Sequence, residues 1–387
     1  MVNAVPSDIN RRLDDLLAGP AFKLEPRLHH AQLLSLLKVE LAYAAQCNAH
    51  LLHHLEAWPI DYRRATKIAD LPYLPVGVFK ATPPLALVTP DKITRTLASS
   101  ATTGQTPSRV VLDAETSKRM TRSVMSIVRD FVGSMRRPYL VIDSLENLTS
   151  NSELGARAAA IQGLRSFATE IVCCLQKDGT GNLNVDEEKL LNFADKWRSG
   201  EVLVYGFTYV IWQHLIAPLQ KKRISLNMPN VWVLHSGGWK RLQDYAVTPT
   251  TFVEGVASVF GCAEKRILDF YGMVENVGII YPDCEHRNKH VPAFAEVIIR
   301  DPLTLSPVKV GEQGLVQVCS VLPTSFPGFL VLTEDIGEVV HNDGCPCGRR
   351  GTAFRFVKRV PKAELRGCGN VDTNRKIPVA SSLLLHG

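Results

Sequence analysis

The feature that most constrains the fold is a regular alternation of short apolar runs and helical segments between residues 120 and 271. The runs read as buried strands and lie at 139–142, 171–175, 202–205, 231–234 and 267–271. Helical spacing of apolar residues marks the segments between them, as in the face formed by Met120, Val124, Ile127 and Phe131. Strands joined by helices pair in parallel, and a parallel sheet is covered by helices on both faces. The sequence therefore predicts an α/β fold with a largely parallel sheet.

Different patterns flank this central part. Residues 7–70 predict helices, because Leu33, Leu37 and Leu41 recur at helical spacing among polar residues. From about Ala293, short apolar runs alternate with Gly and Pro turns. That pattern indicates a small antiparallel β region attached to the α/β body.

Composition and charge narrow the class of protein. The 387 residues are 45% hydrophobic and 21% charged, as in a globular protein. The net charge of +6 is modest and no basic block carries interleaved aromatic residues, so nucleic acid is not an expected partner. Charges throughout the first residues and the lack of a long apolar run argue against a signal peptide and a membrane span. The nine scattered cysteines, an odd number, favour a cytoplasmic location.

One loop is rich in hydroxyl groups. Residues 99–109 read Ser-Ser-Ala-Thr-Thr-Gly-Gln-Thr-Pro-Ser-Arg. Backbone N–H groups in such a loop can form an anion-binding concavity, and Ser and Thr hydroxyls add neutral donors. The loop is not a Walker loop, because the Gly-Lys-Ser/Thr ending is missing. Two interpretations remain, a phosphate-binding loop and a solvated Ser/Thr turn.

Two of the expected strands end in sequences that suit a ligand, which in such folds binds at the carboxyl ends of parallel strands. One strand ends in His235-Ser236-Gly237-Gly238, where paired glycines let the backbone approach a flat ligand or turn sharply. The other ends in Tyr271-Gly272-Met273-Val274-Glu275, which could stack on a base and bind Mg²⁺ at phosphates. For each, the alternative is an ordinary turn or a solvated surface charge.

Two charged residues follow in the β region. Asp335 comes directly after the expected strand 330–332, and a carboxylate there can accept hydrogen bonds from ribose hydroxyls. Arg359 begins a charged segment that runs to Gly367. Taken separately, Asp335 is equally a turn aspartate and the later segment equally a solvated linker.

A second group of residues has the composition of a metal site. Cys345-Pro346-Cys347-Gly348 is a tight Cys-x-Cys turn, and Cys284 and His290 lie upstream. Three thiolates and one imidazole make a closed tetrahedral structural zinc site, with His286 as the rival fourth ligand. Unrelated buried thiols and a surface histidine are the alternative. The zinc would join the β region to the sheet and take no part in catalysis.

The order of these features points to a family. The chain resembles the adenylate-forming superfamily in the order of five features. They are a hydroxyl-rich loop, a Gly-Gly strand end, Tyr-Gly-x-x-Glu, Thr-x-Asp and a late Arg. Closer matches at 75–80, 99–108, 235–240 and 345–349 resemble the acyl-protein synthetase family of bacterial bioluminescence, which is kin to phenylacetate–CoA ligases. The resemblance runs from about residue 70 to 369. It implies that a carboxylic acid attacks the α-phosphate of ATP, giving acyl-adenylate and pyrophosphate.

The resemblance also implies a role for particular residues. Glu275 would hold Mg²⁺ and act in catalysis, and the loop would cradle the phosphates. The implied ATP contacts are Ser100, Thr102, Thr103, Gly104, Arg109, Gly237, Gly238, Tyr271, Gly272, Asp335 and Arg359. The implied substrate pocket, for a fatty or an aromatic acid, consists of Phe207, Tyr209, His235 and Ser236.

The domain organisation follows from the same resemblance. Residues 1–357 would form the adenylate-forming domain, with a helical part at 1–70 and the β region at 293–357. Residues 358–387 would be a vestigial C-terminal segment, because the final domain of full-length relatives is reduced or absent. In that segment Cys368 would accept the acyl group, by analogy with a late cysteine of the bioluminescence family; an incidental cysteine is the alternative.

Two departures from the superfamily pattern keep other functions open. Ala101 stands where a glycine is usual, and Ser108-Arg109 stands where a lysine usually follows the proline, with Arg109 a possible substitute for its charge. The acceptor could be CoA, a carrier protein, an amine or the chain's own cysteine. The alternatives are an acyl-CoA ligase of the phenylacetate–CoA ligase type and a non-catalytic descendant that binds ATP and an acyl group.

Overall fold

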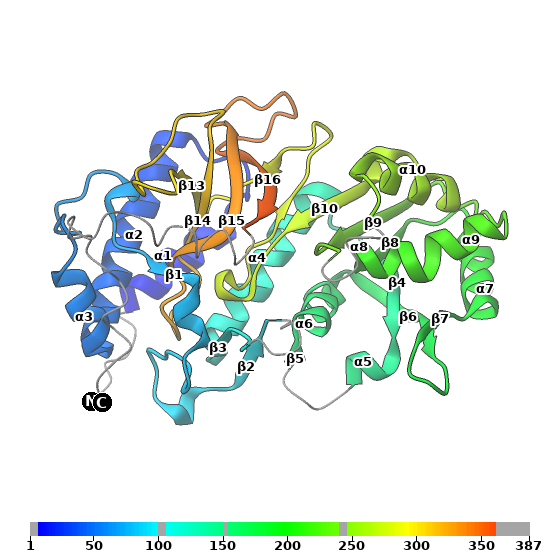
Figure 1. Ribbon diagram of the computed structural model, residues 1–387, viewed down its shortest axis with the longest axis horizontal. Coiled ribbons are helices and arrows are strands. Elements are labelled where there is room, and N and C mark those ends of the chain that lie inside the picture. Colours follow the sequence, from blue (N-terminus) through cyan, green and yellow to red (C-terminus); the bar gives the residue numbers. More distant parts are fainter. Residues whose placement is uncertain (1–6, 100–105, 150–153, 240–245, 361–387) are drawn as a thin grey trace.

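The structure, a computed structural model, describes residues 7–99, 106–149, 154–239 and 246–360. A seven-stranded sheet occupies the right half of Figure 1, in the order β11-β10-β9-β8-β4-β6-β7. Its five inner strands pair in parallel, and the edge strands β11 and β7 are antiparallel to their neighbours, so the largely parallel sheet is confirmed. The strands are β4 (Arg137–Ser144), β6 (Ala168–Lys177), β7 (Leu183–Val185), β8 (Val202–Phe207), β9 (Val231–Ser236), β10 (Ile267–Tyr271) and β11 (Tyr281–Pro282).

Helices cover both faces of this sheet. Helix α4 lies between the two halves of the molecule, since Ile127 packs in the core of the β region and Val128 in the core of the parallel sheet (Figure 1). The helices are α4 (Ala114–Val132), α5 (Leu145–Thr149), α6 (Ala156–Gly163), α7 (Glu187–Trp197), α8 (Thr208–Ile211), α9 (Ala217–Lys221) and α10 (Pro249–Phe260). A π-helical turn, Trp212–Ile216, joins α8 to α9.

Local signals set most of these helix ends. Asp186 accepts a hydrogen bond from the backbone N–H of Lys189 and caps α7. Gly261 ends α10 in the left-handed conformation, with φ of 74°, which costs a residue without Cβ little. Helix α6 ends at Gly163, and Ala168 already begins β6 opposite Arg137 of β4.

The second sheet is antiparallel and has the strand order β12-β16-β15-β14-β13. The short strand β1 pairs in parallel with β15. The expected antiparallel β region is therefore present, extended by two strands from outside it. The strands are β1 (Leu74–Pro75), β12 (Lys289–His290), β13 (Ala295–Arg300), β14 (Gln313–Ser320), β15 (Leu330–His341) and β16 (Ala353–Arg359).

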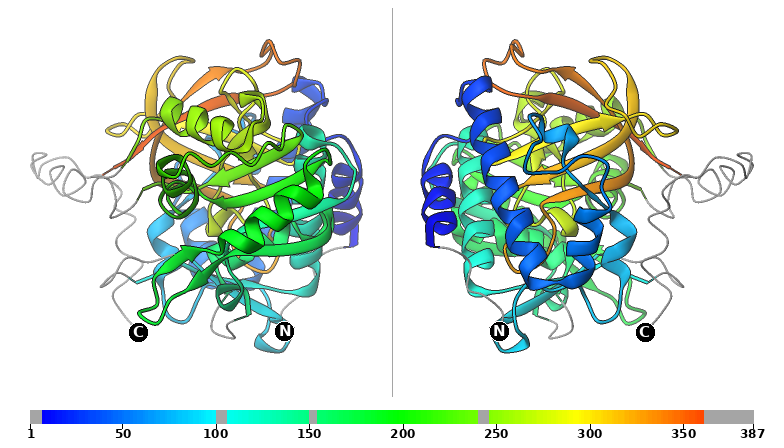
Figure 2. Two further views of the ribbon diagram at one scale, coloured as in Figure 1. Left: turned by 90° about the vertical axis from the view of Figure 1, so that its right-hand side faces the viewer. Right: turned by 90° about the vertical axis from the view of Figure 1, so that its left-hand side faces the viewer.

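The N-terminal helices pack on the antiparallel sheet, as the right-hand view of Figure 2 shows. They are α1 (Ser7–Ala18), α2 (Pro26–Cys47) and α3 (Ala49–Glu56). Pro26 stands at the first position of α2, where its missing N–H costs nothing, and Glu25 caps the helix. Leu13, Leu33 and Leu37 are fully buried in one core with residues of β13, β14 and β15.

A third, small sheet has the order β3-β2-β5 and was not expected from the sequence. The antiparallel pair β2 (Arg95–Ala98) and β3 (Arg109–Leu112) flanks the hydroxyl-rich loop, and β5 (Leu154–Gly155) pairs with β2. Among the described residues, no helix combines the length and the apolar character needed to cross a membrane.

Candidate active site

The carboxyl ends of β8, β9 and β10 lie side by side, because the three strands pair in parallel and in register. Phe207 is opposite Ser236, and Ser236 is opposite Phe270. The segments that follow these strands carry the residues expected to bind substrate and nucleotide. Tertiary structure therefore brings both groups of residues to one edge of the sheet.

Tyr271, Asp335 and Arg359 form one hydrogen-bonded group at this edge. The Tyr271 hydroxyl donates to Asp335 Oδ2 at 2.8 Å, and Arg359 Nε donates to Asp335 Oδ1 at 2.8 Å. Asp335 and Arg359 are directly opposite each other on β15 and β16, so the strand register sets this contact. Burial, and then the neighbouring Asp335 carboxylate, raise the pKa of Tyr271 well above its usual value, which keeps its hydroxyl a donor.

Glu275 lies in a short 3₁₀ turn, Val274–Asn276, directly after β10. It is only 5% exposed, and this burial raises the pKa of its carboxyl group even though Ser108 donates a hydrogen bond to it. Asp335 and Arg359 also act on Glu275 electrostatically. The buried carboxylate is therefore near enough to Asp335 and Arg359 to be affected by their charges.

Ser108 connects Glu275 to the hydroxyl-rich loop. Its backbone N–H donates to Ser99 Oγ at 2.9 Å, and its carbonyl oxygen accepts from the Ser99 N–H at 2.9 Å. These two bonds close the base of the loop beside Glu275. Arg109 is half-buried in β3 opposite Ala98. The expected phosphate contacts Ser100, Thr102, Thr103 and Gly104 lie outside the described residues, as does Cys368.

Phe356, which the sequence analysis missed, stacks on Tyr271. The ring centroids are 5.7 Å apart at an interplanar angle of 24°, and Phe356 is 40% exposed. Tyr281 lies 5.9 Å from Tyr271 at 34° and is fully buried. The accessible aromatic surface beside Asp335 therefore includes Phe356 as well as Tyr271. In the sequence, the one signal for Phe356 was its position among apolar residues three positions before Arg359.

The four residues expected in the substrate pocket divide between the two faces of β9. Ser236 Oγ lies 3.0 Å from the Tyr205 hydroxyl, and the Phe207 ring packs against Gly237 and lies 6.4 Å from the Tyr209 ring. His235 points to the opposite face, because successive side chains of a strand alternate. It lies 4.5 Å from the Phe252 ring and is 6% exposed. The structure thus does not place His235 in one pocket with Ser236.

The backbone after β9 is open. Gly237 has φ of 81°, a conformation that favours glycine, and none of the described residues lies within 4 Å of the Cβ that a side chain at Gly238 would add. Gly272 by contrast is tight, with the carbonyl oxygen of Ile279 3.4 Å from such a Cβ. The Gly237-Gly238 backbone can therefore approach a flat ligand, and the absence of a side chain at Gly272 allows the close approach of Ile279.

Cys284, His290, Cys345 and Cys347 converge, with all their donor atoms within 4.8 Å of one another. Cys284 Sγ lies 3.9 Å from Cys345 Sγ, and Cys347 Sγ lies 3.2 Å from His290 Nε2. The donor set is one that could hold a metal ion. His286, the rival ligand, has an exposed side chain, and only its backbone N–H contacts Cys284 Sγ.

The pKa shifts in this Cys/His cluster favour the metal-ligating forms of Cys345 and His290, whereas burial raises the pKa of Cys284 to about 12 and also raises that of Cys347. Burial raises the pKa of Cys345, but the backbone N–H of Cys347, the Asn288 amide and the neighbouring thiols outweigh burial and lower it below its usual value. Burial lowers the pKa of His290 to about 4, which keeps the imidazole neutral at pH 7. A thiolate and a neutral imidazole are the forms that ligate metals.

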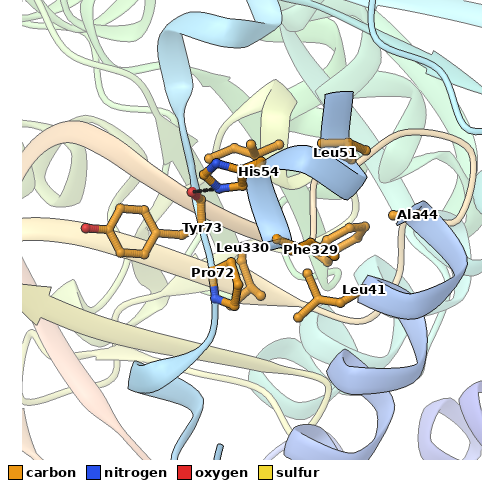
Figure 3. A pocket seen from close by; sticks show the side chains of 10 residues that line it. Leu41, Ala44, Leu51, His54, Pro72, Tyr73, Phe329 and Leu330 are labelled. Atoms are coloured by element: carbon orange, nitrogen blue, oxygen red, sulfur yellow. Dashed lines mark hydrogen bonds between the residues drawn. The ribbon is translucent and has the colours of Figure 1, made fainter. Parts of the chain in front are cut away.

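A small apolar pocket lies elsewhere, between α2, α3 and the start of β15 (Figure 3). Leu41, Leu51 and Phe329 are among its lining residues. The Nε2 atom of His54 is 3.0 Å from the carbonyl oxygen of Tyr73 and supplies the polar contact drawn there. None of the residues expected to bind ligands lines this pocket, so we attribute it to the packing of the N-terminal helices.

Solved structures with this fold define the class of protein. 2-Hydroxyisobutyryl-CoA ligase, in its postadenylation state with the adenylate 2-HIB-AMP, has a TM-score of 0.65 at 14% identity over 88% of this chain and 69% of that one. The open conformation of the same ligase, with 2-HIB-AMP and CoA, has a TM-score of 0.63 at 14% identity over 85% and 74%. The protein therefore has the fold of the adenylate-forming ligases.

Sequence comparison identifies the family. Residues 26–377 match the profile of the acyl-protein synthetase family, LuxE, and the chain belongs to that family. A long-chain-fatty-acid–luciferin-component ligase of Aliivibrio fischeri is 26% identical over 313 residues, 78% of this chain and 77% of that protein. The ligase of the same name from Vibrio harveyi is 31% identical over 140 residues, 36% of each protein. The chain is accordingly a carboxylate-activating ligase that forms an acyl-adenylate with ATP and transfers the acyl group.

Proposed function

We propose that this protein activates a long-chain fatty acid with ATP and transfers the acyl group to a thiol or amine acceptor. The observation that carries the proposal is the convergence of Tyr271, Glu275, Asp335 and Arg359 beside Ser108, at the base of the hydroxyl-rich loop. The choice of acid is supported by the two curated relatives, which are named as long-chain-fatty-acid ligases.

In this proposal the polar group at the strand ends binds the nucleotide. Asp335 accepts hydrogen bonds from ribose hydroxyls, and Arg359 and the Tyr271 hydroxyl hold its carboxylate in one orientation. The rings of Tyr271 and Phe356 and the open Gly237-Gly238 backbone receive the flat base. The loop that starts at Ser99 cradles the phosphates through its N–H and hydroxyl groups.

The chemistry is an in-line displacement, in which the enzyme mainly positions groups and neutralises charge. Glu275 is the ligand for Mg²⁺, which when bound neutralises developing charge on the phosphates. Ser108 donates a hydrogen bond to the Glu275 carboxylate at the loop base and thereby orients the metal ligand. Ser236 and Tyr209 line the pocket for the acid, on the face of β9 opposite to His235.

The Cys/His cluster is, in this proposal, a structural zinc site. A tetrahedral ion with Zn–S bonds of about 2.3 Å requires sulfur atoms about 3.8 Å apart, and the Cys284–Cys345 separation of 3.9 Å fits. The four ligands come from the segment after β11, from β12 and from the turn before β16, so the ion would join the antiparallel sheet to the edge of the parallel sheet. With no open ligand position, it would have no catalytic role.

Carboxylate-dependent ATP–pyrophosphate exchange tests the proposed function. We expect exchange with long-chain fatty acids such as tetradecanoate, and far less with phenylacetate. Glu275→Gln should lower the exchange rate by at least about a hundredfold while keeping the fold, because it removes a charged metal ligand. Glu264→Gln, at an exposed acidic residue away from the site, is the matched control and should behave as the wild type. Full exchange by a folded Glu275→Gln variant would contradict the assignment.

A further inference from the structure

Lys289 is a buried lysine that the proposed chemistry does not use. It precedes His290 in β12 and is 5% exposed. Its ammonium group donates to Asp269 Oδ2 at 2.7 Å and to Asp283 Oδ1 at 3.0 Å. A buried charge is tolerated only when it is paired, and removing one partner leaves the others uncompensated. The position of Lys289 is therefore tightly defined by two carboxylates.

Asp269 lies beside His235 at the end of β9. The two residues are directly opposite each other in the parallel pair, and Asp269 Oδ1 lies 3.6 Å from His235 Nδ1, within electrostatic range but beyond hydrogen-bond distance. His235 Nδ1 in turn lies 2.9 Å from Thr208 Oγ1. Thr208 Oγ1 donates to the carbonyl oxygen of Ser236 at 3.2 Å, so it accepts from Nδ1–H of His235.

This line of contacts ends at the proposed nucleotide site in two places. It reaches the Ser236–Gly237 peptide through Thr208, and Gly237 begins the open backbone after β9. It also includes Asp269 of β10, two residues before Tyr271. Asp269 and Tyr271 share one face of that strand because successive side chains alternate. His235 lies on this same face, opposite Asp269.

We propose that Lys289 is a positioning residue for nucleotide binding, acting through Asp269, His235 and Thr208 on the Ser236–Gly237 peptide. The inference rests on the proposed nucleotide site. Lys289 sets the spacing between the end of β9 and Tyr271 on β10, and it connects both to the strand that carries His290. A contact line of this kind contributes a unique geometry more than net stability, since buried ion pairs are weak stabilisers.

Equilibrium binding of ATP with Mg²⁺, measured by calorimetry, tests this role without requiring turnover. Lys289→Met should raise the Kd for ATP by about tenfold, and Lys289→Arg, which keeps the charge, should restore most of the affinity. Thr208→Val should raise the same Kd by about threefold. Because Lys289 acts through Thr208, the double variant should be weaker than wild type by clearly less than the product of the two factors. If Lys289→Met fails to fold, Lys289→Gln, which removes the charge and keeps a polar side chain, takes its place in the same cycle with Thr208→Val.

Controls separate this role from a structural one. Lys196→Met removes an exposed lysine that pairs with Glu170 and should leave the Kd unchanged. An unchanged Kd in Lys289→Met with a lowered thermal midpoint, or fully additive factors in the cycle, would overturn the inference. ATP binding with the expected cycle but no pyrophosphate exchange would support the inference and contradict the proposed function. A wild type that binds no ATP would overturn both.

Discussion

Phe356 presents an exposed aromatic ring beside the proposed ribose contact Asp335. If it receives the adenine base, Phe356→Ala should raise the KM for ATP by about tenfold, since stacking of a base on an aromatic ring is worth about 1–3 kcal/mol. The KM for the fatty acid should change by less than about twofold, because Phe356 lies on the nucleotide side of the strand ends. Pyrophosphate-exchange kinetics with each substrate varied in turn measure both values.

The neighbouring residue supplies the control for that experiment. Val357 is 39% exposed on the same strand, and Val357→Ala should leave both KM values unchanged. Phe356→Tyr, which keeps an aromatic ring, should retain affinity for ATP. Equal rises in the KM for ATP and for the acid in Phe356→Ala would instead indicate a general disturbance of the site.

His235 makes stability depend on pH. Burial lowers its pKa to about 4, although Asp269 acts in the opposite direction and Lys289 and Arg287 add to the lowering. The unfolded chain takes up the proton near pH 6.5 and the folded chain only near pH 4, so stability falls as the pH is lowered between these values. From pH 7 to pH 5 the loss attributable to His235 should be about 2 kcal/mol.

Denaturant unfolding at the two pH values checks this dependence. His235→Gln removes the titrating group and keeps a polar side chain. The difference in unfolding free energy between pH 7 and pH 5 should therefore be smaller in the variant than in the wild type by about 2 kcal/mol. Identical pH dependence in the two proteins would show that His235 is not held neutral by the fold.

At the scale of elements, the Cys/His cluster joins β12, the turn before β16 and the segment after β11. Purified protein should carry about one zinc ion per chain, measured by elemental analysis. Cys345→Ser or Cys347→Ser should lower the unfolding free energy by more than the about 1 kcal/mol typical of a single substitution, because metal-binding energy is folding energy. Both variants should also lose the ion.

A thiol outside the cluster provides the comparison. Cys47 is half-buried in α2, and Cys47→Ser removes a sulfur atom without touching the four ligands. This variant should keep its zinc and most of its stability. Zinc-free wild type, prepared without any chelator, would refute the site.

At the scale of the whole molecule, the cysteines can be compared as candidate acceptors of the acyl group. Burial raises the pKa of each of Cys47, Cys173, Cys174, Cys262 and Cys319, which disfavours their nucleophilic thiolate forms. Cys284, Cys345 and Cys347 belong to the cluster. This distribution favours Cys368, flanked by glycines and near Arg366, as the chain's own acceptor.

Labelled fatty acid tests that role. With ATP present, the label should become covalent and alkali-labile, and Cys368→Ser should remove at least about nine-tenths of it, since a thioester requires the thiol. Cys47→Ser should keep the label. Covalent label that persists in Cys368→Ser would place the accepting group on another residue, and rapid stoichiometric acyl-CoA formation would make CoA the acceptor.

The sequence by itself determined the elements whose signals are local. Apolar runs separated by helical segments predicted the parallel sheet, and residues with local capping chemistry, Asp186 and Gly261, stand at helix ends in the structure. The order of short motifs along the chain was enough to indicate the family. The Cys-x-Cys turn likewise pointed to a group of possible metal ligands, and the structure brings these residues together.

Only the tertiary structure decided which side chains meet. Strand register places His235 and Ser236 on opposite faces. Contacts between segments far apart in sequence bring His290, and not His286, to the three cysteines. The roles proposed for Ser108, Phe356 and Lys289 rest on contacts of the same kind. The strands on either side of the hydroxyl-rich loop were missed because each is short and pairs only with a neighbour across the loop or with β5. Periodicity and caps act over a few residues, whereas contacts between strand ends arise only when the sheets assemble.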